Sequence, residues 1–299
     1  MPARIYVGTS SWADKELVDS GRFYPPDLKD SESRLRYYGE RFNLVEVDST
    51  YYALPSTRNA ERWAERTPED FRFDVKAFAL FTAHPTPLGS IPKSFHERLP
   101  EESRKKARLY YKDVPEDVRT DLWSIFRNAL RPLYGGGRLG TILIDLPPWA
   151  GPSEANRAQV LESAIHLPDY RVVVEFRSPA WVNDEHREAT FAFLRQHNLG
   201  FVCVDEPPGL KSSVPPLAEV TAHTAVVRFR GRKADTWETR GVSTVERLNW
   251  LYTDEELTEW LPRIEKLARE AEEVHLIFNT KAGDQGVRNT TRLQRLLAI

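Results

Sequence analysis

Eight short segments that are almost continuously apolar recur along this chain, and stretches with helical spacing separate them. They are rich in Val, Ile, Leu and Phe, which is typical of parallel strands covered on both faces. The segments are Arg4–Gly8, Leu44–Asp48, Phe71–Lys76, Leu139–Leu146, Arg171–Phe176, Phe201–Asp205, Ala225–Arg230 and Val274–Asn279. Eight strands with helical crossovers predict an α/β fold, a closed parallel (β/α)8 barrel of the TIM type. A doubly wound open sheet is the alternative.

The connections between the strands mostly carry helical periodicity. It predicts helices over Ser31–Phe42, Pro115–Leu130 and Thr253–Glu270, and the last begins with an N-cap pattern at Thr253. Residues 83–114 form a long charged insertion after the third strand, either a lid or a solvated excursion. Residues 206–224 contain four prolines, so we expect an irregular crossover between strands six and seven. No repeat or linker divides residues 1–299, which we expect to form one domain.

Composition limits the classes of partner and compartment. The formal net charge of -2 gives no global electrostatic argument for a nucleic-acid or membrane partner. The one cysteine, Cys203, lies in an apolar strand, where a thiol is usually a small buried filler, and one thiol fits a reducing compartment. The N-terminus lacks a signal-peptide pattern, and no apolar run reaches the roughly 20 residues of a membrane span. We therefore expect a cytoplasmic protein.

Charged side chains gather at the C-terminal ends of the predicted strands. Residues two apart share a face of a strand, and the charged faces carry Glu46 and Asp48, Asp74 and Lys76, Asp145, Glu175 and Arg177, Asp205, Arg228 and Arg230, and the polar Asn279. An unpaired charge under the outer helices would cost several kcal/mol. These faces should therefore point inward, at the mouth where such barrels carry their active sites. Ion pairs that fill the mouth without catalysis are the alternative.

The loops after strands seven and eight indicate an oxyanion site. Arg228, Arg230 and Arg232 end strand seven, and a glycine-containing loop after strand eight leads into a helix with Arg288 and Asn289. Such loops and the helix N-terminus are the usual phosphate site of these barrels. We expect an anion near Arg230, Arg232 and the helix start around Gly286; a solvated basic rim is the alternative.

Aromatic residues follow or adjoin the same strand ends. They are Trp12, Tyr51, Tyr52, Trp149, Trp181 and Trp237. Stacked bases or sugar rings would suit them, and filling of the gaps between loops is an equal alternative. His84 is the histidine that lies just beyond a strand end. Too few histidines follow the strands for a multi-zinc site. A single Mg²⁺ or Mn²⁺ on Glu46, Asp145, Glu175 and Asp205 stays open.

Several of these segments resemble the YecE-like family of unknown function, domain-of-unknown-function family 72. The matching motifs are Gly8-Thr9-Ser10-Ser11-Trp12, Val45-Glu46-Val47-Asp48-Ser49-Thr50-Tyr51-Tyr52, Phe71-Arg72-Phe73-Asp74-Val75-Lys76-Ala77, Leu146-Pro147-Pro148, Val174-Glu175-Phe176-Arg177 with Trp181, Arg228-Phe229-Arg230-Gly231-Arg232, and Phe278-Asn279 with Val287-Arg288-Asn289. The resemblance implies a barrel and no established reaction. Ser11, Asp48, Asp145 and Thr280 depart from the family pattern, and the two aspartates add negative charge at the mouth.

Our functional hypothesis is a hydrolase-like enzyme for a phosphate-bearing substrate, such as a nucleotide, a nucleic acid or a sugar phosphate. Glu175 is the expected general acid or base, and Lys76 and Arg228, with Glu46, complete the catalytic set. The expected substrate-binding residues are Thr9, Trp12, Asp48, Tyr51, His84, Asp145, Arg177, Trp181, Asp205, Arg230, Arg232, Asn279, Arg288 and Asn289. A non-catalytic module for nucleic acid or a phosphorylated metabolite is one alternative. A glycoside hydrolase using Asp145 and Glu175 is another.

Overall fold

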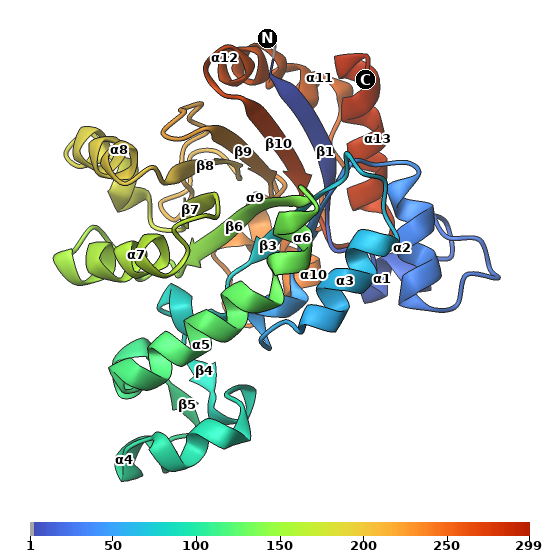
Figure 1. The fold of residues 1–299 in the computed structure, drawn as a ribbon. Coiled ribbons are helices and arrows are strands. Elements are labelled where there is room, and N and C mark those ends of the chain that lie inside the picture. The colour runs from blue at the N-terminus through green and yellow to red at the C-terminus, as the bar shows by residue number, and fades with distance from the viewer. Residues whose placement is uncertain (1–2) are drawn as a thin grey trace.

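The computed structural model describes residues 3–299 and contains a closed eight-stranded parallel barrel (Figure 1). The barrel strands are β1 (Arg4–Ser10), β2 (Leu44–Val47), β3 (Arg72–Lys76), β6 (Leu139–Leu146), β7 (Val172–Phe176), β8 (Gly200–Asp205), β9 (Thr224–Phe229) and β10 (Glu273–Phe278). They follow one another around the barrel in chain order, and β1 closes it by pairing with both β2 and β10. The predicted TIM-type barrel is confirmed, and the open sheet is wrong.

Helices surround the barrel, most of them on its outside (Figure 1). They are α1 (Lys15–Asp19), α2 (Ser31–Gly39), α3 (Thr57–Glu65), α5 (Glu116–Ala129), α6 (Arg131–Gly135), α7 (Glu154–His166), α8 (Arg187–Gln196), α9 (Ala234–Trp237), α10 (Thr244–Arg247), α11 (Asp254–Thr258), α12 (Leu261–Glu270) and α13 (Gln285–Leu297). The outer strand faces meet them with aromatic rings. Phe73 stacks on Trp63 of α3, with ring centroids 6.1 Å apart, and Phe229 meets Trp260 at 5.3 Å.

The helix predicted over residues 253–270 is two helices, α11 and α12. Its start is as expected, because Thr253 and Glu256 form a reciprocal capping box. The first helix ends at Thr258, and the second begins at Leu261 with Pro262 in its first turn. Proline has no N–H to donate to the preceding turn, so it starts a helix readily but interrupts one.

The two irregular connections are also present. Residues 206–223, between β8 and β9, contain no helix or strand. The insertion at 83–114 contains the antiparallel pair β4 (Thr86–Pro87) and β5 (Arg108–Leu109) and the short helix α4 (Glu101–Arg104). Figure 1 shows this insertion, in teal and green, extending beyond α5 and away from the barrel. Its first residues nevertheless stay at the barrel mouth.

One extra residue in β6 sets the phase of that strand. The register with β3 passes from Phe73 opposite Leu139 to Val75 opposite Ile142, which is a bulge. Beyond the bulge, Asp145 faces the barrel interior opposite Glu175. Gly140 lies in the bulge because a Cβ there would come within 2.3 Å of an oxygen of Asp74.

Among residues 3–299, no helix is long and apolar enough to cross a membrane.

Candidate functional site

The C-terminal ends of the strands surround a cavity of about 600 Å³. This mouth cavity has the size of a small-molecule site. Its walls come from segments far apart in the chain, because the ends of all the barrel strands except β8 contribute side chains. The lining consists of Ser11, Asp14, Asp48, Ser49, Tyr51, Tyr52, Lys76, His84, Asp145, Arg177, Arg228, Arg230, Thr244, Val245, Arg247, Leu248, Asn279 and Lys281. Seven of the predicted binding residues thus share one cavity with the predicted catalytic Lys76 and Arg228, namely Asp48, Tyr51, His84, Asp145, Arg177, Arg230 and Asn279. The predicted catalytic Glu175 is fully buried behind Arg228 and Arg230.

A buried layer of ion pairs forms the base of this cavity. Arg228 donates to Glu46 at 2.7 Å and to Glu175 through its other terminal nitrogen. Arg230 donates to the second oxygen of Glu175 at 2.5 Å, and its Nε lies 3.6 Å from Glu206. All five side chains are buried. Both oxygens of Glu175 are therefore occupied by arginine, which makes this residue a strut across the barrel rather than a free base.

Burial and neighbouring charges shift the pKa values of Glu175 and Glu46 in opposite directions. Burial alone would raise the pKa of Glu175, but Arg228 and Arg230 outweigh it and the pKa is lowered, so the group stays ionised. Burial dominates at Glu46 and raises its pKa to about 7, although Arg228 opposes that effect. The two predicted catalytic carboxylates thus share one arginine but differ in how readily they hold a proton.

A second, more open layer of charges lies above the struts. Lys76 pairs with Asp145 at 2.8 Å, and Lys281 pairs with Asp48 and Asp14, both at 3.0 Å. The remaining oxygen of Asp145, Oδ1, is buried and has no hydrogen-bond partner within residues 3–299. Burial would raise the pKa of Asp145, but Lys76 and Arg177 outweigh it and hold that pKa well below its usual range. Asp145 therefore presents an ionised oxygen that is not used internally.

Arg177 differs from the other basic residues at the base of the cavity. No carboxylate lies within 4 Å of its guanidinium, and its side chain makes no hydrogen bond to any described residue. Burial, reinforced by the neighbouring charge of Arg230, lowers the pKa of Arg177. Arg247 of α10 also lacks a carboxylate partner in the described chain, but it donates to the backbone oxygen of Thr239. Arg177 is thus a partly exposed cation with free donors.

Aromatic rings line one edge of the cavity. Tyr51 meets Tyr52 edge to face at 5.1 Å and His84 at 5.4 Å, and His84 in turn meets Trp149 at 5.8 Å. Lys76 Nζ lies 4.7 Å from the centre of the Tyr51 ring. Burial, with Lys76 and Arg177 nearby, lowers the pKa of His84, so its imidazole is neutral at neutral pH. We name Tyr51, Tyr52, His84 and Trp149 the aromatic edge.

Asp205 does not face the mouth, which corrects the inward phase expected for strand six. Asp205 lies opposite the outward-facing Phe229 in the register. Its carboxylate accepts from Tyr252 at 2.5 Å, from Trp260 at 2.8 Å and from Arg232 at 2.9 Å. These donors remove the penalty that we expected for a charge under the outer helices. Cys203 shares this outward face, and burial raises its pKa to about 12.

The expected anion site of loops seven and eight is not assembled. Arg230 is held by Glu175 inside the barrel, and Arg232 is held by Asp205 and Glu259 outside it. Arg288 is exposed on α13, away from the mouth lining. Carboxylates thus occupy the forks of the two strand-end arginines, a feature that the loop sequences do not reveal.

Three other predicted binding residues have supporting positions. Asn289 accepts from the backbone of Tyr252 and donates to Thr280, which joins two loops. The backbone N–H of Thr9 donates to the Tyr38 hydroxyl of α2 at 2.8 Å, on the outer face of β1. Trp181 is fully buried on Phe176, with its indole N–H on the backbone oxygen of Ala150. None of the three lines the mouth cavity.

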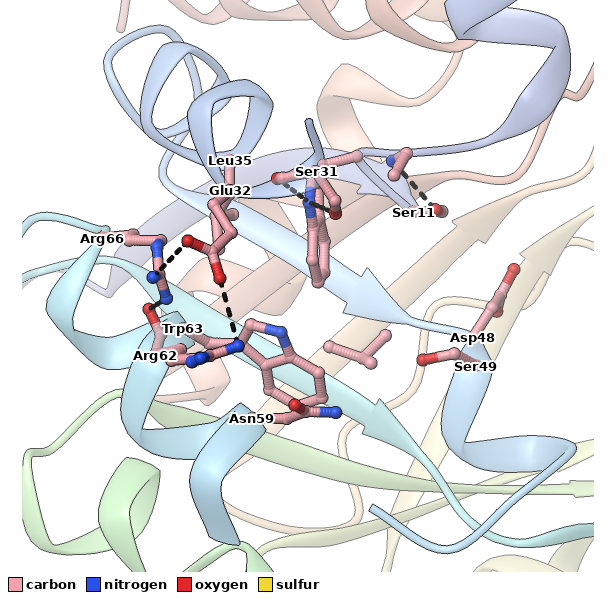
Figure 2. Close-up of a pocket in the computed structure, with 13 residues that line it drawn as sticks. Ser11, Ser31, Glu32, Leu35, Asp48, Ser49, Asn59, Arg62, Trp63 and Arg66 are labelled. Atoms are coloured by element: carbon pink, nitrogen blue, oxygen red, sulfur yellow. Dashed lines mark hydrogen bonds and ion pairs between the residues drawn. The ribbon is translucent and has the colours of Figure 1, made fainter. Parts of the chain in front are cut away.

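Trp12 lines a separate groove of about 380 Å³ between α2 and α3 (Figure 2). Its indole N–H donates to Ser31, and its ring meets Trp63 edge to face at 5.9 Å. Figure 2 shows Glu32 between two arginines at one end of the groove, with Arg62 at 3.3 Å and Arg66 at 2.6 Å. The groove shares Ser11, Asp48 and Ser49 with the mouth cavity. Both arginines of the groove thus share the single carboxylate of Glu32.

Sequence reasoning missed Glu206, Lys281 and Arg247. Glu206 could have been found by reading strand six in the other phase, because it lies two residues beyond the inward-facing Val204. Lys281 follows β10 but was treated only as part of a glycine-containing loop. Arg247 lies on a short helix far from any strand end, and no local pattern marks it.

The carboxylates considered for a divalent metal do not form one cluster. Asp205 faces outward, and Glu46, Glu175 and Asp145 each accept from arginine or lysine. Within residues 3–299, no three His, Cys, Asp or Glu side chains are grouped so that they could hold a metal ion. The Mg²⁺ or Mn²⁺ hypothesis therefore has no preformed ligand set in this arrangement.

Comparison with known proteins gives matches over nearly the whole chain. The family model described as "Protein of unknown function DUF72" matches residues 6–299. The chain is 26% identical to the UPF0759 protein YunF of Bacillus subtilis, over 99% of this chain and 95% of that protein. It is 27% identical to YecE of Escherichia coli, over 76% of this chain and 74% of that protein.

Two crystal structures of DUF72 family proteins are similar to this chain over their full length. The protein from Enterococcus faecalis is 22% identical, with a TM-score of 0.76, and the match covers 99% of this chain and 98% of that one. The protein from Thermotoga maritima is 29% identical, with a TM-score of 0.73, and the match covers 99% of this chain and 100% of that one.

Proposed function

The chain belongs to the DUF72 family of proteins of unknown function, and we propose that its barrel mouth binds a phosphate-bearing ligand whose oxyanion is held by Arg177. One observation carries this proposal. Lys76, Lys281, Arg228 and Arg230 each contact a carboxylate, whereas the described residues supply none to Arg177. A guanidinium offers a planar fork of donors that matches an oxyanion.

The surroundings of Arg177 support an anion better than a cation. Lys76 lies nearby, close enough to lower the pKa of the neighbouring His84 together with Arg177. Asn279 lines the same cavity, and its side-chain amide makes no hydrogen bond within the described chain. The carboxylates beneath are already occupied by Arg228 and Arg230. An incoming phosphate would therefore meet the unused donors of Arg177, on a wall that also carries the unpartnered Oδ1 of Asp145.

The test compares Arg177→Gln with the matched control Arg288→Gln. Arg288 was expected at the phosphate site from sequence but lies exposed on α13. Isothermal titration with inorganic phosphate and with ribose 5-phosphate should show about 10- to 100-fold weaker binding for Arg177→Gln, the value of a charge-assisted hydrogen bond. The control should bind like the wild type. Equal losses in both variants, or unchanged binding in Arg177→Gln, would overturn the proposal.

Hydrolysis of a phosphate ester is the second candidate function, with Asp145 rather than Glu175 as the carboxylate that orients the attacking water. Asp145 has a buried oxygen without a partner in the described chain, beside Lys76 and on the wall that carries Arg177. That ionised oxygen would orient an attacking water by accepting its hydrogen bond, while Lys76 and Arg177 would stabilise charge on the phosphoryl group. Glu175 cannot take this role without breaking two ion pairs.

The measurement is phosphate release from p-nitrophenyl phosphate and from ribose 5-phosphate, with and without Mg²⁺ or Mn²⁺. Loss of the carboxylate that orients the water should lower kcat by about 10²-fold or more, so Asp145→Asn should turn over much more slowly while phosphate still binds. If the wild type binds these compounds but does not hydrolyse them, the hydrolase hypothesis is wrong and the protein acts as a binding module. The glycoside-hydrolase alternative gains no support, since it needs a second free carboxyl group and Glu175 is held by two arginines.

A further inference from the structure

The aromatic edge lies between the mouth cavity and a second pocket, and two of its four rings are unusually exposed. Tyr52 is 70% exposed and Trp149 is 65% exposed. Tyr110, from the insertion, is 42% exposed and lines the second pocket together with Trp149. Large aromatic side chains are usually covered in a folded protein, and clusters of exposed ones mark binding surfaces.

The edge is continuous from one cavity to the other. Tyr51, Tyr52 and His84 line the mouth cavity, and Trp149 lines the neighbouring pocket of about 270 Å³. The step between them is the His84–Trp149 contact at 5.8 Å. A ligand that occupies the mouth therefore has a path of aromatic faces leading out of it.

The second pocket offers hydrogen-bond acceptors and few charges. The amide nitrogen of Asn156 donates to the backbone of Gly151, and that of Gln159 donates to Phe81, so neither side-chain oxygen is used within the described residues. Lys112 of the insertion is the charged residue in the lining, and no carboxylate is present there. These two oxygens can accept from the edge of a ring that carries amino groups.

We propose that the phosphate-bearing ligand also carries a planar heteroaromatic ring, as a mononucleotide does, and that this ring stacks on the aromatic edge while the phosphate contacts Arg177. This inference rests on the proposed function and adds the substrate class. It also assigns a role to the insertion at 83–114, which supplies the far wall of the ring pocket through Tyr110, Tyr111 and Lys112. The insertion is then a specificity element at the side of the mouth.

The experiment compares AMP with ribose 5-phosphate, which has the sugar and the phosphate but no base. Both are titrated calorimetrically into the full chain and into Trp149→Ala, Trp149→Phe and Arg177→Gln. Tyr134→Ala is the matched control, because Tyr134 is 49% exposed on α6 and lines neither cavity. Stacking of one base is worth about 1–3 kcal/mol, or roughly 5- to 150-fold in affinity.

We expect AMP to bind more tightly than ribose 5-phosphate, and Trp149→Ala to remove that advantage without weakening ribose 5-phosphate. Trp149→Phe should restore most of it, and Tyr134→Ala should change nothing. If AMP has no advantage, or Trp149→Ala keeps it, the ring inference is wrong while the Arg177 result can still stand. If Arg177→Gln binds both compounds like the wild type, the proposed function fails instead.

Discussion

The barrel interior carries charged side chains at both ends, and the two ends use them differently. At the N-terminal end, which we name the floor, Glu273 accepts from Arg4 and from Arg171, each at 2.6 Å. His275 lies 2.9 Å from Asp74 and 3.5 Å from Glu273. At the mouth, the buried layer is also ion-paired, although Glu46 Oε2 and Arg228 Nε have no hydrogen-bond partner in the described chain. In the open layer above it, Arg177 has no carboxylate partner and one oxygen of Asp145 has no hydrogen-bond partner within the described residues.

This difference separates charges that hold the barrel from charges that can act. A buried carboxylate or guanidinium is tolerated when its partners satisfy it, as at the floor. A group left unsatisfied beside a cavity costs stability unless water or a ligand meets it. Charge density alone therefore does not mark a functional site in this barrel, and we propose that the unpartnered groups lining the mouth cavity do.

Removing the strut should have the largest effect on folding. Glu175→Gln keeps the size of the side chain but leaves Arg228 and Arg230 without their shared charge, and breaking a buried pair costs about 3–5 kcal/mol. Urea unfolding monitored by circular dichroism should show a free energy of unfolding lower by that amount. A loss under about 1 kcal/mol would mean that the mouth relaxes around these arginines, and the contrast with the open layer would be weaker than we argue.

The floor should make stability depend on pH through His275. Burial opposes protonation, but Asp74 and Glu273 outweigh it and raise the pKa of His275 from 6.5 to about 9. The folded state thus binds this proton more tightly than the unfolded chain. The resulting stabilisation, about 3 kcal/mol, is fully present below pH 6.5 and is lost as the pH rises through 9.

The measurement is unfolding by urea at pH 6.5 and at pH 9.5, for the wild type and for His275→Asn. The variant corrects for all other groups that titrate in this range. The wild type should lose about 3 kcal/mol more than the variant between the two pH values. Equal losses of stability in both proteins would show that His275 is neutral at the floor. The charged side chains of the floor would then be less completely ion-paired than the distances between them indicate.

The smallest effect is expected for Arg177, the cation without a carboxylate partner in the described chain. Arg177→Gln should change the free energy of unfolding by less than about 0.5 kcal/mol, because the substitution breaks no ion pair or hydrogen bond within the described chain. The same urea titration provides this value. A loss above about 1 kcal/mol would place Arg177 among the structural charges of the mouth and remove the distinction on which the proposed function depends.

Much of the scaffold could be predicted from local pattern. The eight strands were found because apolar residues in buried parallel strands form runs that any single sequence displays. The start of α11 was found because a capping box involves only neighbours in sequence. The break before α12 was missed, although Pro262 was visible, because the apolar spacing continues across it.

From the sequence, the site could be predicted only as a group of charged residues at the C-terminal ends of the strands. Alternation placed Glu46, Lys76, Glu175 and Arg228 on inward faces, and the structure has them there. The same rule failed at β8, where Asp205 turns outward to Tyr252 and Trp260, and Glu206 lies inside instead. Because side chains alternate along a strand, the sequence shows which residues share a face, but it does not show which face points into the barrel.

The sequence by itself determined the order of strands and helices in this protein, since each depends on residues a few positions apart. Only the tertiary structure decided which arginine forms an ion pair with which carboxylate. Arg228, Arg230 and Arg232 look alike along the chain, yet each is held by a different set of carboxylates, from β2, β7 and β8 and the segments that follow them. Arg177 is left without one. The reason is that ion pairing depends on distances of a few ångströms between segments far apart in sequence, and only the closed barrel sets those distances.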